Sequence, residues 1–353
     1  MYQDYLKRAL KLAEKRRGFC SPNPAVGAVV VKDGKIIGEG WHEKAGAPHA
    51  EVMALASAGS SAAGGILYVT LEPCSHTGRT PPCTDLIIKT GIKAVYYGFK
   101  DSNLTVSGQG EFYLKSAGIA CEQIELPEIN AFYSSYAHWL KTKKPWVTAK
   151  IALSLDEKIA SVDGKPLAIT GPELQAFTHQ CRLKSDAILT TANTIFADDP
   201  QLNVRLENET FSKPLYVLDS QLKIPLSARI FKTATSVTLL HAVEAPLQKK
   251  QPFEAHQVRC HQINADHSGL NLQEILAVIG QDGIHDLWIE AGGRCFQSFW
   301  EQGLIHRALI YQSSKMLGEK GKPAFSPSFS LLKFLEKTSF NSYGADRLYD
   351  IPL

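Results

Sequence analysis

The chain has 353 residues, which is long enough for about two domains of ordinary size. Its hydrophobic fraction of 44% and charged fraction of 21% are typical of a globular chain and exclude a disordered or collagen-like one. A formal net charge of +3 does not provide the basic surface that nucleic-acid binding requires, so we expect no nucleic-acid partner.

The cysteines and the amino-terminus indicate the cellular compartment of the protein. Seven cysteines are an odd number at irregular spacing, which argues against a disulfide framework and suits a reducing environment. The amino-terminal residues contain no uninterrupted apolar core of the kind found in a signal peptide. No apolar run approaches the roughly 18 residues of a membrane span. We therefore expect a cytoplasmic protein with no membrane partner.

Helices and strands alternate through the first part of the chain. Apolar residues at helical spacing predict a helix over residues 2–16, and Asp33-Gly34 between two apolar runs predicts a hairpin of strands 25–31 and 35–40. The pattern then predicts, in order, a helix at 49–58, a strand at 66–71, a helix at 83–90, a strand at 94–99, a helix at 110–117, a strand at 119–124 and a helix at 131–141. This alternation predicts a layered α/β domain. A short basic linker ends it, so the expected domains are residues 1–144 and 145–353.

The second part repeats the alternation with a different sequence. Strands are expected at 146–153, 187–190, 215–218, 237–241, 287–289 and 307–311, with helices near 173–183, 272–279 and 295–302. This pattern predicts a Rossmann-like α/β domain. It lacks Gly-x-Gly-x-x-Gly, but the turn 290–294 (Glu-Ala-Gly-Gly-Arg) lies between a strand and a helix. Such a turn can offer backbone N–H groups to a phosphate, and an ordinary glycine turn is equally compatible.

Four residues of the first domain predict a catalytic zinc site. His49, Cys74 and Cys83 combine one imidazole with two thiols, which suit zinc, and three protein ligands leave a fourth position for water. Zinc lowers the pKa of such a water to about 7, and Glu51 is free to move protons. His-x-Glu followed by Pro-Cys and a second Cys is the signature of zinc nucleobase deaminases. Two residues separate the cysteines in that signature, whereas eight do here. Each residue alone could be an ordinary core residue.

Other polar residues stand near the ends of predicted elements. Asn23 precedes the first strand and His42 follows the second, so either could face a pocket or belong to a turn. His76 and Arg79 lie in the insert between the two cysteines and could reach a substrate. The run 198–200 (Asp-Asp-Pro) could contact a cofactor or simply form a turn.

Longer segments around these motifs carry a family resemblance. In the first domain they are residues 23–27, 38–42, 48–51 and 72–83. In the second they are residues 150–156, 185–189, 194, 197–200, 204–205 and 289–293. Over nearly its whole length the chain resembles the bifunctional riboflavin-biosynthesis deaminase–reductases. Among its departures from that pattern, Glu157 stands where the family has glycine.

The resemblance implies a fold and a function for each domain. It implies an N-terminal cytidine-deaminase-like α/β/α layered domain and a C-terminal dihydrofolate-reductase-like α/β domain. It implies zinc-dependent hydrolytic deamination of 2,5-diamino-6-(5-phosphoribosylamino)pyrimidin-4-one, followed by NADPH-dependent reduction of the ribosyl group to ribityl. The expected cofactors are one Zn²⁺ per chain and NADPH. The expected partners are this small-molecule substrate and further copies of the chain, in a homo-oligomer that is a dimer or tetramer.

The resemblance also assigns residues by matching motif. Glu51 would be catalytic, and the deaminase pocket would be lined by Asn23, His42, His76, Arg79, Asp101 and Asn103. The reductase substrate site would contain Lys150, Arg182, Leu202, Arg205 and Glu290. Among these, Lys150 and Arg205 could bind the substrate phosphate through their charge or be solvated surface cations. Facing NADPH would be Ala152, Ala168, Thr194, Asp198, Ser220, Gly292, Gly293 and Arg294.

Two other functions are also compatible with the sequence. One is a deaminase of bases in RNA whose second domain only binds, which would need a basic, aromatic face. The other is a zinc-stabilised scaffold without catalysis, which would need a fourth protein ligand at the metal.

Overall fold

The computed structural model describes residues 2–76, 81–101, 108–161, 168–267 and 269–353. Contacts within the chain divide it into two compact units. Unit 1 comprises Met1–Lys144 with Gly280–His285, and unit 2 comprises Pro145–Ile279 with Asp286–Leu353. In the described ranges, no helix combines the length and the apolar character needed to cross a membrane.

Unit 1 contains a five-stranded sheet with the strand order β2-β1-β3-β4-β5. Its strands are β1 (Gly27–Lys32), β2 (Lys35–Trp41), β3 (Ile66–Leu71), β4 (Ala94–Phe99) and β5 (Ala120–Gln123). β1 runs antiparallel to β2 and β3, whereas β3, β4 and β5 are parallel. The carboxyl ends of β3 and β4 therefore meet at one edge, where sites form in sheets of this type.

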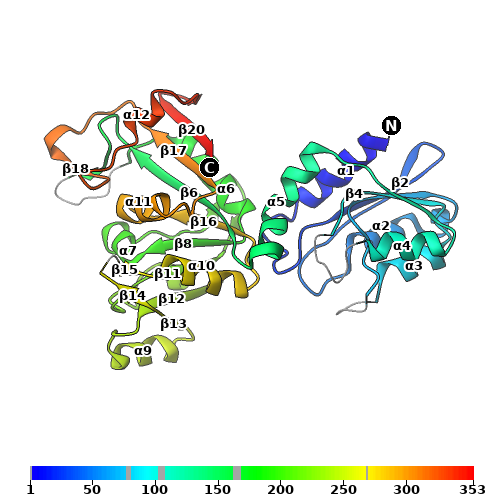
Figure 1. Ribbon diagram of the computed structural model, residues 1–353, viewed down its shortest axis with the longest axis horizontal. Coiled ribbons are helices and arrows are strands. Elements are labelled where there is room, and N and C mark those ends of the chain that lie inside the picture. Colours follow the sequence, from blue (N-terminus) through cyan, green and yellow to red (C-terminus); the bar gives the residue numbers. More distant parts are fainter. Residues whose placement is uncertain (1, 77–80, 102–107, 162–167, 268) are drawn as a thin grey trace. The chain divides into compact units, whose positions relative to one another are not determined.

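Helices cover both faces of this sheet (Figure 1). One face carries α1 (Tyr2–Glu14) and α5 (Pro127–Thr142), and the other carries α2 (Ala50–Ala58), α3 (Cys83–Thr90) and α4 (Gln109–Ser116), with a short 3-10 turn, η1 (Gly59–Ala62), after α2. Successive strand residues point to opposite faces. Val29 and Val31 accordingly pack in the core with α1 and α5, whereas Ala28 and Val30 pack in the core with α2 and α3. The predicted α/β/α layering is confirmed.

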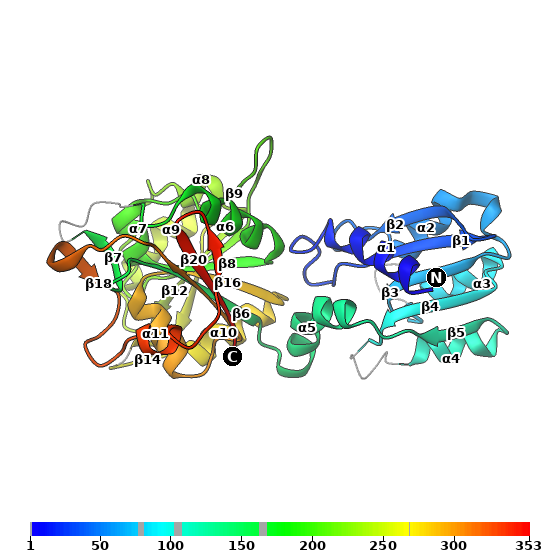
Figure 2. The ribbon, with the colours of Figure 1, turned by 90° about the horizontal axis from the view of Figure 1, so that it is seen from above.

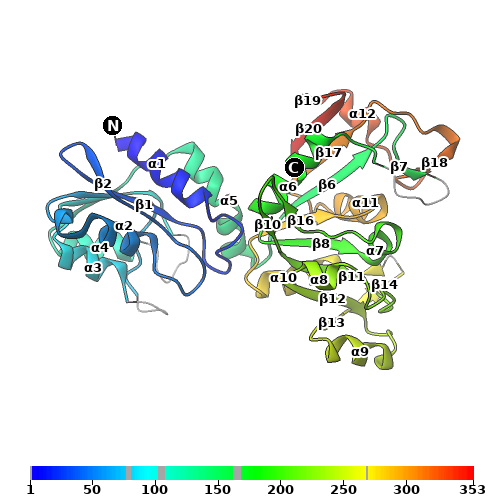
Figure 3. The same ribbon diagram turned by 180° about the vertical axis from the view of Figure 1, so that it is seen from behind.

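Unit 2 contains a nine-stranded sheet with the order β13-β12-β11-β8-β16-β6-β17-β20-β19 (Figure 3). Its strands are β6 (Trp146–Leu153), β8 (Ala187–Thr191), β11 (Pro214–Leu218), β12 (Ser236–Ala242), β13 (Arg259–Ile263), β16 (Asp286–Glu290), β17 (Arg307–Gln312), β19 (Asn341–Tyr343) and β20 (Asp346–Pro352). All pairs from β13 to β17 are parallel. β20 is antiparallel to both β17 and β19.

Three small two-stranded sheets accompany the large one. They pair β9 (Val204–Arg205) with β10 (Thr210–Phe211), β7 (Lys158–Ser161) with β18 (Gly321–Pro323), and β14 (Ala265–Asp266) with β15 (Gly269–Leu270). The β9–β10 hairpin lies outside the large sheet, so its position depends on other contacts.

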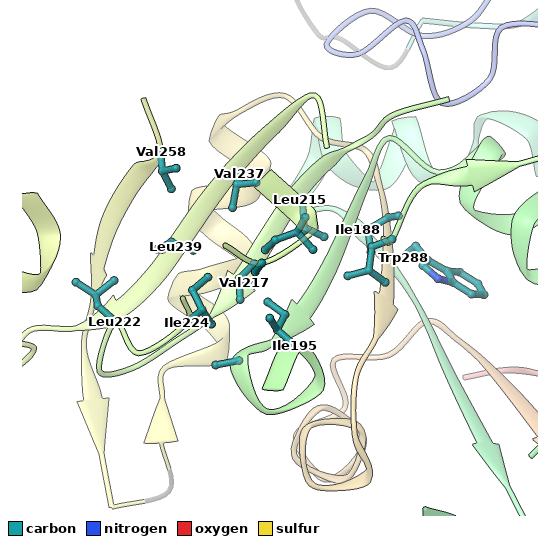
Figure 4. Packing of buried hydrophobic residues seen from close by; sticks show 14 of the residues in the cluster. Ile188, Ile195, Leu215, Val217, Leu222, Ile224, Val237, Leu239, Val258 and Trp288 are labelled. Carbon is teal, nitrogen blue, oxygen red and sulfur yellow. The ribbon is translucent and has the colours of Figure 1, made fainter. Parts of the chain in front are cut away.

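The helices of unit 2 lie on both faces of its sheet. They are α6 (Pro172–Lys184), α7 (Ala192–Asp198), α8 (Ile230–Thr233), α9 (Lys250–Ala255), α10 (Leu272–Gln281), α11 (Gly293–Glu301) and α12 (Leu332–Leu335), with the 3-10 turns η2 (Leu247–Lys249) and η3 (Gly318–Lys320). Residues of α6 to α9 share one core with strand residues such as Ile188, Val217 and Trp288 (Figure 4). The opposite face carries α10 and α11 (Figures 1 and 3). The Rossmann-like α/β fold is confirmed.

The predicted elements are present with small shifts at their ends. The largest shift is at α5, which begins at Pro127 and not at residue 131. Proline favours the first turn of a helix because its missing N–H is not needed there. Among the elements that the sequence did not predict, α7 and β9 are short, and β13 and β19 lie at the two edges of the large sheet. The strand β20, with 7 residues between β17 and β19, was also not predicted.

The structure explains how glutamate is accommodated at position 157. Glu157 has a positive φ of 55°, a conformation that glycine adopts more readily. Its carboxylate accepts hydrogen bonds from Ser330 Oγ at 2.7 Å and from the Leu331 backbone N–H at 2.6 Å. These bonds to an anion offset part of the backbone strain.

Candidate active sites

The three predicted zinc ligands meet at the edge of the unit 1 sheet. His49 is the N-cap of α2, Cys74 follows β3, and Cys83 is the first residue of α3. His49 Nδ1 lies 3.2 Å from Cys83 Sγ and 3.5 Å from Cys74 Sγ, and the three ligand atoms lie within 4.8 Å of one another. Ligands about 2.0–2.3 Å from a tetrahedral zinc are roughly 3.3–3.8 Å apart, so this geometry fits zinc.

The chemistry of the two sulfurs also fits a metal. Hydrogen bonds from Cys83 and His49 lower the pKa of the Cys74 thiol to about 4, whereas the neighbouring Cys74 and burial raise the pKa of Cys83. The Cys83 backbone N–H donates to Cys74 Sγ at 3.3 Å, which further supports a thiolate there. A zinc ion bound here would deprotonate Cys83 as well, because a metal ion deprotonates the thiols that coordinate it.

Glu51 lies beside this cluster on the first turn of α2. Its side chain is buried, and burial together with the Cys74 charge raises its pKa to about 7. A carboxyl group with such a pKa can both accept and donate a proton near neutral pH. In the described part of the chain the metal cluster contains three ligands and no fourth. An open fourth position is the catalytic arrangement and disfavours the scaffold interpretation.

Asn23 and His42 form one hydrogen-bonded unit close to His49. His42 Nδ1–H donates to the Pro48 carbonyl at 3.1 Å, and Asn23 Nδ2 lies 3.1 Å from His42 Nε2. Burial lowers the pKa of His42, so its ring is neutral and Nε2 accepts from Asn23. The side-chain carbonyl oxygen of Asn23, Oδ1, consequently points away from His42. The His42 and His49 rings meet edge to face, with centroids 5.5 Å apart.

The remaining predicted pocket residues of unit 1 are only partly described. His76 is exposed, two positions after Cys74. Asp101 is half-buried just beyond the carboxyl end of β4. Arg79 and Asn103 lie outside the described residues.

Glu72 is a buried residue whose importance the sequence analysis missed. Its carboxylate accepts hydrogen bonds from the backbone N–H groups of Gly108 at 3.0 Å and Glu111 at 3.2 Å. It therefore fixes the start of α4 close to the end of β3. Its place immediately before Pro73-Cys74 is the signal that could have revealed it.

A largely buried ion network joins three predicted substrate residues of unit 2. Glu290, the last residue of β16, accepts from Arg182 Nε at 2.9 Å and Nη2 at 2.8 Å, and lies 3.8 Å from Lys150 Nζ. Trp288 Nε1 donates to the same carboxylate at 2.9 Å. Burial opposes ionisation of Glu290, but the charges of Arg182 and Lys150 hold its pKa well below the usual range. Glu290 is therefore an anion that neutralises one of the two cations.

Arg205 differs from Arg182 in having nitrogens left for a ligand. Arg182 donates through all three nitrogens, because its Nη1 reaches the Asn203 carbonyl at 2.8 Å. Arg205 Nη1 donates to Gln201 Oε1 at 3.1 Å and Asn203 Oδ1 at 2.6 Å. Its Nε and Nη2 have no hydrogen-bond partner among the residues that the structure describes. Leu202 is buried between these positions with a φ of 47°.

We expect Glu290→Gln to lower the free energy of unfolding by about 3 kcal/mol. The change would leave Arg182 and Lys150 as buried cations without their carboxylate. The exposed pair Arg307–Asp350, with Nη2 and Oδ2 2.6 Å apart, provides the control. Asp350→Asn should cost at most about 1 kcal/mol, because solvent screens that pair. Urea unfolding of the full chain measures both, and equal losses would contradict the predicted difference.

Four predicted NADPH-facing residues lie at or beyond the carboxyl ends of parallel strands. Ala152 is near the end of β6, Thr194 follows β8, Ser220 follows β11 and Gly292 follows β16. Cofactors bind at this edge in open α/β sheets. Asp198 ends α7, and burial raises its pKa although the charge of Lys150 opposes the shift.

The glycine turn after β16 is open at its first glycine and closely packed at its second. If Gly292 carried a Cβ atom, no heavy atom of the described residues, apart from Gly292 and its chain neighbours, would lie within 4 Å of it. A Cβ atom on Gly293 would lie 1.9 Å from the Ala324 carbonyl oxygen, so only glycine fits there. Gly292 caps α11 without a side-chain hydrogen bond. Backbone N–H groups at such a helix N-terminus can bind a phosphate. Arg294, the next residue after this pair, is exposed. Ala168 lies between β7 and α6 and not at a strand end, and its carbonyl accepts from Lys315 Nζ at 2.8 Å.

The fold and the His-Cys-Cys site define a zinc-dependent deaminase unit joined to a Rossmann-like second unit. Residues 1–99 match the family model for the cytidine and deoxycytidylate deaminase zinc-binding region. Residues 145–349 match the model for the RibD C-terminal domain. The chain belongs to the RibD family.

Individual relatives agree with this assignment. The riboflavin biosynthesis protein RibD of Aquifex aeolicus is 41% identical over 323 residues, covering 90% of this chain and 88% of that protein. The Escherichia coli protein is 35% identical over 333 residues, covering 90% and 89%. The structure of Acinetobacter baumannii RibD aligns with a TM-score of 0.85 at 32% identity, covering 100% and 99%. A Thermotoga maritima deaminase/reductase aligns with a TM-score of 0.83 at 34% identity, covering 99% and 98%.

The chain is thus a bifunctional enzyme of riboflavin biosynthesis with a hydrolase and an oxidoreductase activity. Its cofactors are zinc and NADPH. An RNA deaminase with a second domain that only binds is not favoured, because residues 145–349 match a domain of the riboflavin enzymes.

Proposed function

We propose that residues 1–144 deaminate 2,5-diamino-6-(5-phosphoribosylamino)pyrimidin-4-one and that residues 145–353 reduce the ribosyl group of the product with NADPH. The observation that carries the first step is the His49, Cys74 and Cys83 cluster with buried Glu51 beside it. The Thermotoga maritima relative is described as a diaminohydroxyphosphoribosylaminopyrimidine deaminase and 5-amino-6-(5-phosphoribosylamino)uracil reductase, which supports this substrate.

In the deaminase step, His49, Cys74 and Cys83 would hold the zinc. When bound, zinc supplies a water whose pKa is lowered to about 7. Glu51 accepts a proton from that water as its oxygen adds to the ring carbon bearing the 2-amino group. Glu51 then donates the proton to the amino nitrogen, the carbon–nitrogen bond breaks, and ammonia leaves. Asn23, whose amide orientation His42 fixes, presents its carbonyl oxygen to the pyrimidine.

In the reductase step, bound NADPH would supply the hydride that reduces C1 of the ribosyl group. The Nε–Nη2 edge of Arg205 binds the substrate phosphate, because a guanidinium edge matches two phosphate oxygens. The guanidinium nitrogens of Arg182 already donate hydrogen bonds to Glu290 and Asn203, so Arg182 stabilises the arrangement of the site. Burial lowers the pKa of Lys150, although Glu290 opposes the shift. Its ammonium can therefore donate a proton to the ribose oxygen that is released from C1.

The full-length protein, supplied with the diamino substrate and NADPH, should release one ammonia for each NADPH oxidised. Ammonia release should continue when NADPH is omitted, because the first step needs no hydride. A structured RNA in place of the pyrimidine should yield no ammonia. Comparable ammonia release from RNA, or no release from the pyrimidine, would overturn the proposal.

We also propose that the enzyme is cytoplasmic and forms a homo-oligomer, a dimer or tetramer. The odd cysteine count and the thiol ligands support a reducing compartment. Light scattering during size-exclusion chromatography tests the oligomeric state, and a single-chain mass would contradict it.

A further inference from the structure

The segment that carries Arg205 depends on contacts outside the large sheet for its position. Among the strands that the structure describes, β9 pairs only with β10, and the β9–β10 hairpin extends away from the body of unit 2 (Figure 2). Gln201 and Asn203, which hold Arg205 Nη1, belong to the same segment. They therefore orient the guanidinium relative to the segment and do not place the segment relative to the rest of the site.

Side chains from two helices place this segment. Thr233 Oγ1, from α8, donates to the Gln201 carbonyl at 2.6 Å. Arg182 Nη1, from α6, donates to the Asn203 carbonyl at 2.8 Å. The third contact is to Arg205 itself, whose backbone N–H donates to His179 Nδ1 at 3.1 Å. Residues 179 and 182 are three apart on α6 and so lie on one face of the helix.

The protonation of His179 suits this contact. Because Nδ1 accepts a hydrogen bond, the neutral ring carries its proton on Nε2. Burial and the charges of Arg182 and Arg205 lower the pKa of His179 to about 4, so the ring stays neutral at physiological pH. A neutral acceptor at this position satisfies the Arg205 backbone N–H without adding a further cation to the site.

We propose that His179 is a positioning residue of the reductase, which fixes the backbone of Arg205 and thereby aims its Nε–Nη2 edge at the substrate phosphate. The proposal rests on the proposed function of Arg205 as the phosphate ligand. It extends the site to a residue of α6 that need not touch the substrate or NADPH.

Replacing the acceptor tests this role. His179→Leu keeps a side chain of similar size but removes the acceptor, so KM for the phosphorylated substrate should rise about 10-fold. The kcat and the KM for NADPH should change less than about twofold, because hydride transfer is untouched. His179→Asn places an amide oxygen near the position of Nδ1 and should restore most of the affinity. His256→Leu is the control, because His256 is exposed and its Nδ1 lies 2.8 Å from the carbonyl oxygen of Pro252, a residue of the neighbouring helix α9.

A comparison of phosphorylated and dephosphorylated substrates tests the role of His179 more directly. A dephosphorylated substrate should have the same KM with the parental protein and with His179→Leu. In an Arg205→Ala background, His179→Leu should add no further loss. An unchanged KM in His179→Leu, an equal loss for the dephosphorylated substrate, additive losses, or an asparagine variant as impaired as leucine would each overturn the proposal. His179→Ser replaces the leucine variant if that variant does not fold.

Equilibrium binding of inorganic phosphate separates this proposal from the proposed function. Binding needs no turnover, and it should weaken about 10-fold in His179→Leu and disappear in Arg205→Ala. Equal binding by parental protein and His179→Leu would overturn the role of His179. Parental protein that binds phosphate through Arg205 but does not turn over the phosphoribosylaminopyrimidine would overturn the proposed function and leave the role of His179 standing.

Discussion

Glu51→Gln should reduce ammonia release by about 10⁴-fold while the reductase continues at the parental rate. Losing a general acid–base group typically costs about 10² to 10⁴ in rate, and the upper end applies because one carboxyl serves both proton transfers. Glutamine has the same shape and Glu51 is not a metal ligand, so fold and zinc content should be retained. The measurements are ammonia release from the diamino substrate and NADPH oxidation with substrate that is already deaminated.

Glu122→Gln is the matched control for this change. Glu122 is an exposed glutamate of β5 in the same unit, so its replacement should leave both activities unchanged. Ammonia release near the parental rate in Glu51→Gln would remove Glu51 from the mechanism. Equal loss of both activities, with fold and zinc intact, would mean that the two reactions share one site.

The zinc site could be predicted because its chemistry restricts the residues so strongly. His49, Cys74, Cys83 and Glu51 lie within 35 consecutive residues of the chain, in an order and with residue types that few other functions require. The elements around them also follow from local patterns. Asp33-Gly34 formed the predicted turn between β1 and β2, with Asp33 and Gly34 both at positive φ.

The reductase contacts could not be predicted in the same way. His179 and Arg205 are 26 positions apart and Arg182 and Glu290 are 108 apart, so no local spacing signals either pair. Histidine, arginine and glutamate are also common on surfaces, where they need no partner. Only the parallel pairing of β6, β8 and β16 brings the carboxyl ends of these strands together.

One missed element did leave a local signal. α7 begins after Thr191, whose side chain accepts a hydrogen bond from the Thr194 backbone N–H as an N-cap. Threonine is a favoured N-cap residue because its oxygen satisfies an otherwise free N–H of the first turn. The helix has only 7 residues, about two turns, so its periodicity was too short to reveal it.

Cys83→Ser should remove most of the zinc and lower ammonia release by at least about 10³-fold, with the reductase unchanged. Without the metal, the pKa of the attacking water returns from about 7 toward 15.7, so the nucleophile is lost even though Glu51 remains. Cys121→Ser is the control, because Cys121 is a buried thiol of the same core that is not a ligand and should leave one zinc per chain. Elemental analysis of the purified variants measures the metal. Full zinc occupancy in a His49→Ala, Cys74→Ser, Cys83→Ser triple variant would contradict the assignment, because no other cluster of three or more candidate ligands occurs in the described part of the chain.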